Sequence, residues 1–395
     1  GNPEPEEPGD LSGKIMEVVK MGDAQCTKIK EVIENMAFTG EPVSWTRYGS
    51  GHINDTFKIE CCQGNKTQSY ILQRINHEIF TDPESLMKNI SGVTSFLRKK
   101  IIAAGGDPMR ETLNIVKSRD GREWYRDSQG NYWRAYIFIE NATSYDMVRS
   151  QEDFYQSGRA FGRFQQLLAD YPAEELTETI PDFHNTPVRL ETFKKAVEED
   201  ICGRAGAVKA EIQFVLDRER EAGIAAEMQK NGTLPLKVTH NDTKLNNIMI
   251  DDATGEGICI IDLDTIMPGL SIFDFGDSIR FGANTSAEDD PDCSHSGLSL
   301  PLFEIYTKGF LEGCQGKLTR EEVDMLPMGA KLMTYECGMR FLTDFLQGDT
   351  YFRTTRENHN LDRARTQFAL VADMERKWKE MEAIVEKYRG LWEDK

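Results

Sequence analysis

The hydrophobic pattern of this chain changes at Glu140, and that change restricts the folds the chain can adopt. Across residues 43–139, short apolar runs alternate with turn residues such as Gln63-Gly64-Asn65, which predicts the strands of an antiparallel sheet. After Glu140, apolar residues recur mainly at helical spacing, as they do across residues 326–346. The sequence therefore predicts an α+β protein with a small sheet-rich first lobe and a larger, mainly helical second lobe.

Two helices and one short strand region modify this division. A second-lobe island of strands is predicted at residues 236–263, and a first-lobe helix is predicted where Asp82 provides the N-cap and Pro83 the first turn. Another amphipathic helix is predicted before the sheet, on the apolar stripe Ile29, Val32, Ile33 and Met36. We expect three parts: a flexible lead-in with the N-terminal helix (1–40), a first lobe (41–139) and a second lobe (140–395).

Composition disfavours several classes of protein. The 47 Lys and Arg residues are outnumbered by 66 Asp and Glu residues, giving a net charge of −19, so nucleic-acid binding is not expected. No apolar run approaches the roughly 20 residues that span a bilayer, so no membrane association is expected. The eight cysteines contain no CxxC pair, which favours reduced thiols in a cytoplasmic protein. The acidic start carries no secretory signal, although Gly1 leaves open that a segment was removed, and no protein partner can be inferred.

The strand-rich island contains the residues that point to chemistry. A polar loop, His240-Asn241-Asp242-Thr243-Lys244-Leu245-Asn246-Asn247, lies between two apolar strands, and Ile260-Ile261-Asp262-Leu263-Asp264 follows it. Phosphoryl transfer requires a carboxylate that positions and deprotonates an acceptor hydroxyl, with an Asn and an Asp that hold Mg²⁺ against nucleotide phosphates. Each residue alone has a structural explanation as a turn cap or loop acceptor. The full spacing, H-x-D-x-x-x-x-N before a strand that ends in Asp, favours a kinase-like site.

On these motifs the sequence resembles the aminoglycoside phosphotransferase and choline kinase superfamily, small-molecule kinases with a two-lobed, protein-kinase-like fold. The resemblance implies that ATP and Mg²⁺ are cofactors. It also implies that Asp274 is not a metal ligand and instead fixes the loop that follows the site. It also implies roles for the loop residues: Asp242 as catalytic base, His240 as brace of the loop, Asn247 and Asp262 as metal ligands, Asp264 as a weaker second-metal ligand, and Lys244 near the transferred phosphate, with a merely exposed lysine as the alternative.

The first lobe offers candidate nucleotide-binding residues. Gly49-Ser50-Gly51 lies between two strands, where small residues let backbone N–H groups approach phosphates, although an ordinary hairpin remains the alternative. Arg74 is the only basic residue of the strand expected at Tyr70–Arg74 and is expected to meet the phosphates in place of a lysine, with its acidic partner left unassigned. The apolar strand 135–139 is expected to hold the adenine at Ile137 and Ile139, with a simple buried strand as the alternative.

Further segments resemble the N-acetylhexosamine 1-kinase family. They are Gly51-His52-Ile53-Asn54, Leu72-Gln73-Arg74-Ile75-Asn76, residues 335–344 with 348–352, and residues 358–365. The resemblance implies transfer of the ATP γ-phosphate to the anomeric hydroxyl of N-acetylglucosamine or N-acetylgalactosamine. The implied sugar-binding residues are Asp242, Arg340, Tyr351, His52 and Phe281. A structural ion pair between Arg340 and Glu336, one helical turn earlier, is the competing interpretation.

Three alternatives remain open at this point. The first is a kinase of another small alcohol, such as choline or an aminoglycoside; the acidic residues Asp289, Asp290 and Asp292 would suit the latter, although we expect a solvated loop there. The second is a metal-dependent hydrolase built on His240, Asp242, Asp262 and Asp264. The third is a nucleotide-binding protein without catalysis. The preferred epimer, the tolerance for plain hexoses and the oligomeric state are left undetermined.

Overall fold

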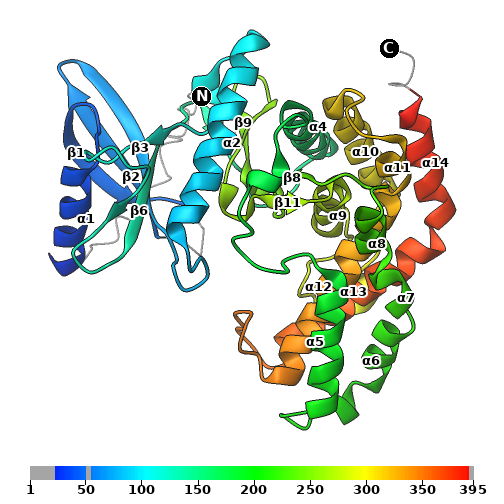
Figure 1. Ribbon diagram of the computed structural model, residues 1–395. Helices are drawn as coiled ribbons and strands as arrows, with labels where there is room; N and C mark the ends of the chain where they lie inside the picture. The colour runs from blue at the N-terminus through cyan, green and yellow to red at the C-terminus, as the bar shows by residue number, and fades with distance from the viewer. Residues whose placement is uncertain (1–22, 50–54, 391–395) are drawn as a thin grey trace, which may run out of the picture. The chain divides into compact units, whose positions relative to one another are not determined.

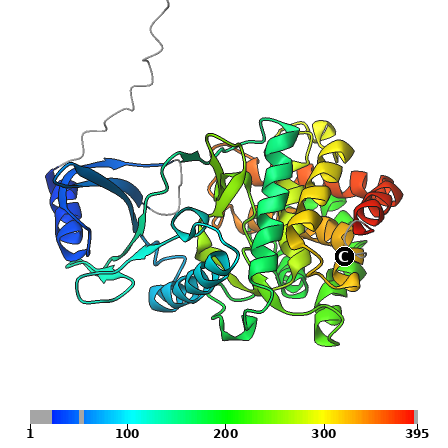
Figure 2. The same ribbon diagram turned by 90° about the horizontal axis from the view of Figure 1, so that it is seen from above.

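The computed structural model of this protein describes residues 23–49 and 55–390 (Figures 1 and 2). Contacts within the chain divide it into two units. The first comprises the chain up to His77 together with Ile115–Phe138, and the second comprises Glu78–Asn114 together with the chain from Ile139 onward. The segment 78–114, which the sequence-based division places in the first lobe, thus groups with the second unit.

The first unit is an antiparallel sheet with one helix packed against it. The strands follow the order β1-β2-β3-β6-β4, and β5 pairs with β6. The two-residue turn Gly64-Asn65 joins β2 to β3, and Gly64 adopts the positive φ of 62° that such a turn favours. The elements are α1 (Asp23–Asn35), β1 (Glu41–Arg47), β2 (Asp55–Gln63), β3 (Lys66–Arg74), β4 (Ile115–Val116), β5 (Tyr125–Arg126) and β6 (Tyr132–Ile137).

The core of the first unit lies between α1 and the sheet. Alternate residues of β2, Phe57 and Ile59, point to the same face of the sheet and are buried against the helix, as the period of a strand requires. The predicted helical stripe supplies the other side of this core, through Ile29, Val32, Ile33 and Met36. The N-terminal helix and its apolar face are therefore confirmed, and Figure 1 shows the helix beside the sheet.

The second unit has two small sheets that flank the polar loop at residues 240–247. One has the order β10-β9-β7, and the other pairs β11 with β8. Strand β8 leads into the loop and β9 leaves it, so the predicted strand-rich island is confirmed. The bounds are β7 (Ala142–Thr143), β8 (Lys237–Thr239), β9 (Ile248–Asp251), β10 (Gly257–Ile260) and β11 (Met267–Gly269).

Helices make up most of the second unit. Helix α2 begins as predicted, because the Asp82 side chain accepts a hydrogen bond from the Ser85 backbone N–H at 3.0 Å. The last two helices of the chain, α13 and α14, are separated by the single residue Lys377. The bounds are α2 (Pro83–Ala103), α3 (Pro108–Glu111), α4 (Gln151–Leu167), α5 (Thr186–Glu199), α6 (Lys209–Leu216), α7 (Glu219–Ala222), α8 (Ile224–Lys230), α9 (Ser271–Gly282), α10 (Leu300–Cys314), α11 (Arg320–Asp324), α12 (Leu326–Gln347), α13 (His359–Arg376) and α14 (Trp378–Arg389).

Glycines allow the long helices of this unit to pack backbone against backbone. Helices α4 and α10 lie side by side (Figure 2), and a Cβ at Gly158 of α4 would lie 2.6 Å from the Tyr306 carbonyl oxygen of α10. Helix α9 meets α12 in the same way, because a Cβ at Gly276 would collide with the Gly329 backbone. These contacts fix α9, which carries several buried charges, close to α12.

Two expectations from composition can be compared with this fold. Across the described residues, no helix is both long enough and apolar enough to span a membrane. The cysteines whose side chains are described are all unpaired thiols, at positions 61, 62, 202, 259, 293, 314 and 337. The mixed α+β class with an antiparallel first unit and a larger helical region is confirmed.

Candidate active site

His240 joins the two sides of the polar loop. Its side chain is fully buried, and its Nε2 atom lies 2.9 Å from the Ile261 carbonyl oxygen. Because a carbonyl can only accept, Nε2 carries the proton, and Nδ1 accepts the Asp242 backbone N–H at 3.3 Å. The imidazole therefore connects the end of β10 to the peptide of Asp242.

Asp274, in the first turn of α9, holds the start of the loop. Its Oδ1 accepts from the Asn241 N–H at 2.8 Å, and its Oδ2 accepts from the His240 N–H at 2.9 Å. Burial raises the pKa of this carboxyl, and its hydrogen bonds and the nearby His240 oppose that rise. The sequence predicted that Asp274 holds the loop after the site; it instead fixes the backbone immediately before Asp242. Asn241 lies in the left-handed region with φ of 66°, so this anchoring maintains a strained turn.

Asp242 and Lys244 form an ion pair at the surface of the loop. The Lys244 Nζ lies 3.5 Å from Asp242 Oδ1, and the Asp242 side chain keeps 30% of its surface exposed. The Asp242 charge raises the pKa of the Lys244 ammonium. Lys244 Nζ also lies 5.6 Å from the centre of the Phe281 ring. A partly exposed carboxylate beside a cation can receive a hydroxyl group from a bound molecule.

Asn247 ends the loop, and Asp262 and Asp264 lie on the segment that follows β10. The Ile261 N–H donates to the Asn247 carbonyl at 2.9 Å, which places Asp262 next to Asn247 in space. Asn247 Nδ2 donates to the Asp242 carbonyl at 2.8 Å, so its amide oxygen is the atom left to bind another group. Asp262 has a left-handed φ of 55°, and Asp264 is buried. Such strain at a non-glycine residue is concentrated at functional sites.

These oxygen donors suit a hard cation such as Mg²⁺. The described residues include no set of three or more His, Cys, Asp and Glu side chains gathered as a metal site. Mg²⁺ needs no such set, because it is usually bound by one or two carboxylates together with substrate phosphates and water. Two carboxylates and one amide oxygen on neighbouring segments therefore fit the implied ion.

The described nucleotide-binding candidates other than Ile139 lie in the first unit. Gly49 has a positive φ of 82°, whereas Ser50, Gly51 and His52 lie outside the described residues. Arg74 pairs with Asp55 of β2 at 2.6 Å and keeps 42% of its side chain exposed. The acidic partner that the sequence left unassigned is thus an aspartate of the adjacent strand.

The two candidates for adenine contact fall on different units. Ile137 is the last residue of β6 and pairs in register with Tyr70 of β3. Ile139 belongs to the second unit and is buried with Met249 and Cys259. The strand predicted across residues 135–139 therefore ends two residues earlier than expected.

Arg340 lies among aromatic rings in the second unit. Its guanidinium carbon is 5.5 to 5.6 Å from the ring centres of Phe183, Tyr351 and Phe352, and Nη2 lies 3.4 Å from the Tyr351 hydroxyl. Asp344 fixes the segment that carries two of these rings, because it accepts the N–H groups of residues 350–352 at 2.8 to 3.0 Å. Phe183 was not predicted, since it lies outside every recognisable motif.

Glu336 is bound to other partners than Arg340. Its carboxylate lies 3.1 Å from His184 Nδ1 and accepts from Thr186 Oγ1 at 2.7 Å. Burial raises the pKa of Glu336, but the charges of His184 and Arg340 and the two hydrogen bonds outweigh it, so that pKa is lowered. Across the described part of the chain, Arg340 makes no ion pair. The competing interpretation of Arg340 as the ion-pair partner of Glu336 is therefore wrong.

A cavity of about 320 Å³ borders this region of the second unit. Its lining includes Asn241 of the polar loop, Phe183 and His184, and Phe273 of α9. Phe183 contacts both this cavity and Arg340. The second unit alone therefore encloses space beside the polar loop, at the lower end of the volume range of small-molecule sites.

Comparison with known proteins supports a common fold. A model of the phosphotransferase enzyme family matches residues 44–300. The structure is similar to that of a microcompartment-associated aminopropanol kinase, with 14% identity, a TM-score of 0.56, and 90% of this chain and 98% of that chain covered. It is also similar to choline kinase from Cryptosporidium parvum, with 12% identity, a TM-score of 0.51, and 87% and 92% covered. The GDP complex of aminoglycoside 2′-phosphotransferase-IIIa matches at 11% identity with a TM-score of 0.50, covering 91% and 98%.

Proposed function

The chain belongs to the phosphotransferase enzyme family, and from that premise we propose that it transfers the γ-phosphate of ATP to the anomeric hydroxyl of N-acetylglucosamine or N-acetylgalactosamine. The family supplies the reaction class, a phosphoryl transfer to a small molecule. The acceptor is inferred from the resemblance of the Arg340 and Tyr351 segments to N-acetylhexosamine 1-kinases and from the chemistry around Arg340.

In this proposal Asp242 is the catalytic base. Its carboxylate is partly exposed, and its backbone is fixed from both sides, by His240 through the Asp242 N–H and by Asn247 through the Asp242 carbonyl. The carboxylate would accept the proton of the sugar hydroxyl as that oxygen attacks the γ-phosphorus in line with the leaving ADP oxygen. Direct transfer of this kind needs no phosphorylated enzyme intermediate.

Lys244 would neutralise negative charge during the transfer. It is held 3.5 Å from Asp242, and the carboxylate maintains its positive charge. A cation at this distance would stabilise the extra charge that develops on the phosphoryl oxygens.

The proposal also assigns ligands to the metal and to the nucleotide phosphates. Asn247, Asp262 and Asp264 would bind Mg²⁺, which supplies charge neutralisation on the β- and γ-phosphates. Arg74 would offer its guanidinium to the phosphates, with Asp55 setting its orientation. One kinase of similar fold was solved with GDP, which supports a nucleotide as phosphate donor.

The residues around Arg340 are the structural basis for the proposed acceptor. The Arg340 guanidinium makes no ion pair within the described residues. A second guanidinium, that of Arg189, lies nearby. Burial lowers the pKa of Arg189, and the positive charge of Arg340 lowers it further. The charges of Arg340 and Arg189 would disfavour a cationic acceptor such as choline or an aminoglycoside beside the Arg340 guanidinium, although the nearby Glu336 and Asp182 carboxylates offset part of that charge. A neutral sugar would instead accept hydrogen bonds from Arg340 while its C–H face packs on the neighbouring rings.

The test is turnover against an acceptor panel. We expect ADP release with N-acetylglucosamine or N-acetylgalactosamine, none with choline or kanamycin, and release lowered by about 10²- to 10⁴-fold in Asp242→Asn, while galactose in the panel measures the tolerance for plain hexoses. Loss of the reducing end of the sugar, followed by the anomeric proton signal in NMR, would show phosphorylation at C1 rather than at another hydroxyl. Turnover of choline or kanamycin without turnover of either N-acetylhexosamine would contradict the proposed acceptor and leave a kinase of another small alcohol.

A further inference from the structure

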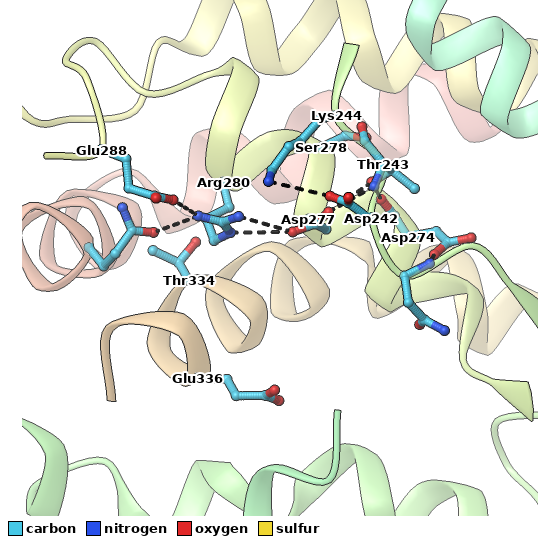
Figure 3. A network of polar contacts seen from close by, with 12 residues as sticks. Asp242, Thr243, Lys244, Asp274, Asp277, Ser278, Arg280, Glu288, Thr334 and Glu336 are labelled. Atoms are coloured by element: carbon cyan, nitrogen blue, oxygen red, sulfur yellow. Dashed lines mark hydrogen bonds and ion pairs between the residues drawn. The ribbon is translucent and has the colours of Figure 1, made fainter. Parts of the chain in front are cut away.

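A buried arginine on α9 lies between two carboxylates close to the polar loop (Figure 3). The Arg280 side chain is 7% exposed, and its Nε and Nη2 donate to Asp277 Oδ1 at 3.3 and 3.2 Å. Its Nη1 donates to Glu288, and also lies 3.4 Å from Gln367 Oε1. A charge this buried is tolerated only when it is paired and hydrogen-bonded, so the arrangement is specific.

Asp277 connects Arg280 to the backbone next to Asp242, the proposed catalytic base. While Oδ1 accepts from Arg280, Oδ2 accepts the Thr243 N–H at 2.9 Å. Ser278 Oγ donates to the Thr243 carbonyl at 2.8 Å, and Thr243 Oγ1 donates to the Asp274 carbonyl at 2.7 Å. Thr243 lies between Asp242 and Lys244, so α9 holds the peptide that joins them.

Glu288 belongs to the acidic loop, which the sequence predicted to be solvated. The Asp289 and Asp292 side chains are 47% and 59% exposed, as a solvated loop requires, but parts of the loop also make fixed contacts with the second unit. Asp289 accepts from His359 Nε2 at 2.9 Å and pairs with Arg356 at 3.6 Å, and the Glu288 carbonyl accepts from Thr366 Oγ1. The loop is therefore fixed to α13, and Glu288 is presented to Arg280 from a fixed position.

The charges around Asp277 show what Arg280 prevents. Burial raises the pKa of Asp277, but the charges of Arg280, Lys244 and His184 outweigh it, so the pKa of this carboxyl is lowered. Without Arg280, Lys244 is the cation of the polar loop that remains near Asp277. The negative charge of Asp277 would then attract Lys244 away from Asp242, and Lys244 and Asp242 would both be displaced.

We propose that Arg280 is a positioning residue for catalysis, clamped by Glu288 of the acidic loop so that Asp277 holds Thr243 and keeps Asp242 and Lys244 in place. This inference rests on the proposed function in one respect, the role of Asp242 as base. It assigns a role to the acidic loop that is independent of which small molecule is the acceptor.

The test compares the wild type with two variants. Glu288→Gln keeps the size of the side chain and loses its charge. Arg280→Lys keeps the positive charge and loses the planar guanidinium that donates to two carboxylates. The control is Lys331→Met, which breaks another buried ion pair of the second unit, between Lys331 and Glu375 at 3.0 Å. Misplacement of a catalytic group by an ångström costs up to about 10²-fold in rate, so we expect kcat to fall about 10- to 100-fold in Arg280→Lys and about 3- to 10-fold in Glu288→Gln. KM for ATP and for the acceptor should stay within about twofold of wild type.

The control separates positioning from stability. Lys331→Met should lower the melting temperature at least as much as Glu288→Gln does, with kcat within about twofold of wild type. Wild-type kcat in both Glu288→Gln and Arg280→Lys would overturn the proposal, as would a kcat loss in Lys331→Met that scales with melting temperature in the same way.

A second measurement does not depend on turnover. Hydrogen exchange of the peptide that contains Thr243 should be faster in Glu288→Gln and Arg280→Lys than in wild type and Lys331→Met, because the Thr243 amide loses its fixed acceptor. Unchanged exchange there would overturn the positioning role. If the wild type phosphorylates a different acceptor, the proposed function fails, and the kcat of the variants is then compared on that acceptor. If no acceptor is found, the hydrogen-exchange measurement alone tests the positioning role of Arg280.

Discussion

Replacing Arg340 by alanine measures how much of acceptor binding depends on one guanidinium. A hydrogen bond from a charged donor is worth about 1.5–3 kcal/mol, so its loss should weaken sugar binding by about one to two decades. KM for ATP should barely change, because the proposed phosphate and metal ligands are Arg74, Asn247 and Asp262.

The effect on stability should be small, because Arg340 makes no ion pair within the described residues. It loses contacts with the rings of Phe183, Tyr351 and Phe352, each worth about 0.5–1 kcal/mol at an exposed site and not additive. The expected loss of about 1–2 kcal/mol corresponds to a few degrees in melting temperature.

Arg126→Ala is the matched control. Arg126 of β5 is another arginine beside an aromatic ring, because its guanidinium carbon lies 5.6 Å from the Tyr132 ring centre, and it belongs to the first unit. It should lower stability by a similar amount and leave sugar KM unchanged. Isothermal titration with sugar, steady-state kinetics and a thermal melt on both variants complete the assay. An Arg340→Ala protein that binds N-acetylhexosamine with wild-type affinity would refute the reasoning and remove Arg340 from the acceptor site.

Three further predictions concern the polar loop and its surroundings. Asp242→Asn should bind nucleotide normally but lose about 10²- to 10⁴-fold in turnover, since an amide cannot accept the acceptor proton; wild-type turnover would exclude Asp242 as the base. Asp262→Ala should weaken Mg²⁺-dependent nucleotide binding in calorimetric titrations with and without Mg²⁺, whereas an unchanged Mg²⁺ dependence would rule it out as a ligand. Because the folded-state pKa of Glu336 is lowered, its ionised form stabilises the fold above the pKa of a free glutamate, about 4.3, and this contribution disappears as pH falls through the folded-state pKa. The melting temperature of Glu336→Gln should therefore lie below wild type at pH 7 and approach it in more acidic buffer; a constant difference across pH would contradict the assignment.

Local signals in the sequence predicted the framework well. The Asp82 cap, the Gly64-Asn65 turn and the apolar stripe of α1 each depend on residues a few positions apart, and the structure contains all three. The loop His240–Asn247 was also recognisable, because its spacing and flanking strands occur within one short segment. The family and the fold class follow from this framework, and they are confirmed.

The contacts that hold the site were less visible, because they join residues far apart in sequence. Arg280 and Glu288 appear in the sequence as an arginine near an acidic run, a pattern typical of a solvated surface, and burial by α13 makes them a clamp instead. The partner of Arg74 was left unassigned, because the strand pairing that brings Asp55 opposite it is not visible in the sequence. Hydrophobic periodicity does not report which charges tertiary packing will bury.

The glycine contact between α9 and α12 has a consequence for acceptor choice. Helix α9 anchors the polar loop through Asp274 and Asp277, and α12 carries Arg340, so two backbones in direct contact set the spacing between the proposed base, Asp242, and the proposed acceptor ligand, Arg340. No side chain lies at Gly276 or Gly329 that could be shortened or lengthened to change that spacing. A variant that accepts a longer alcohol is therefore best sought in the loop that carries Tyr351, whose geometry depends on one aspartate and not on the helix axes.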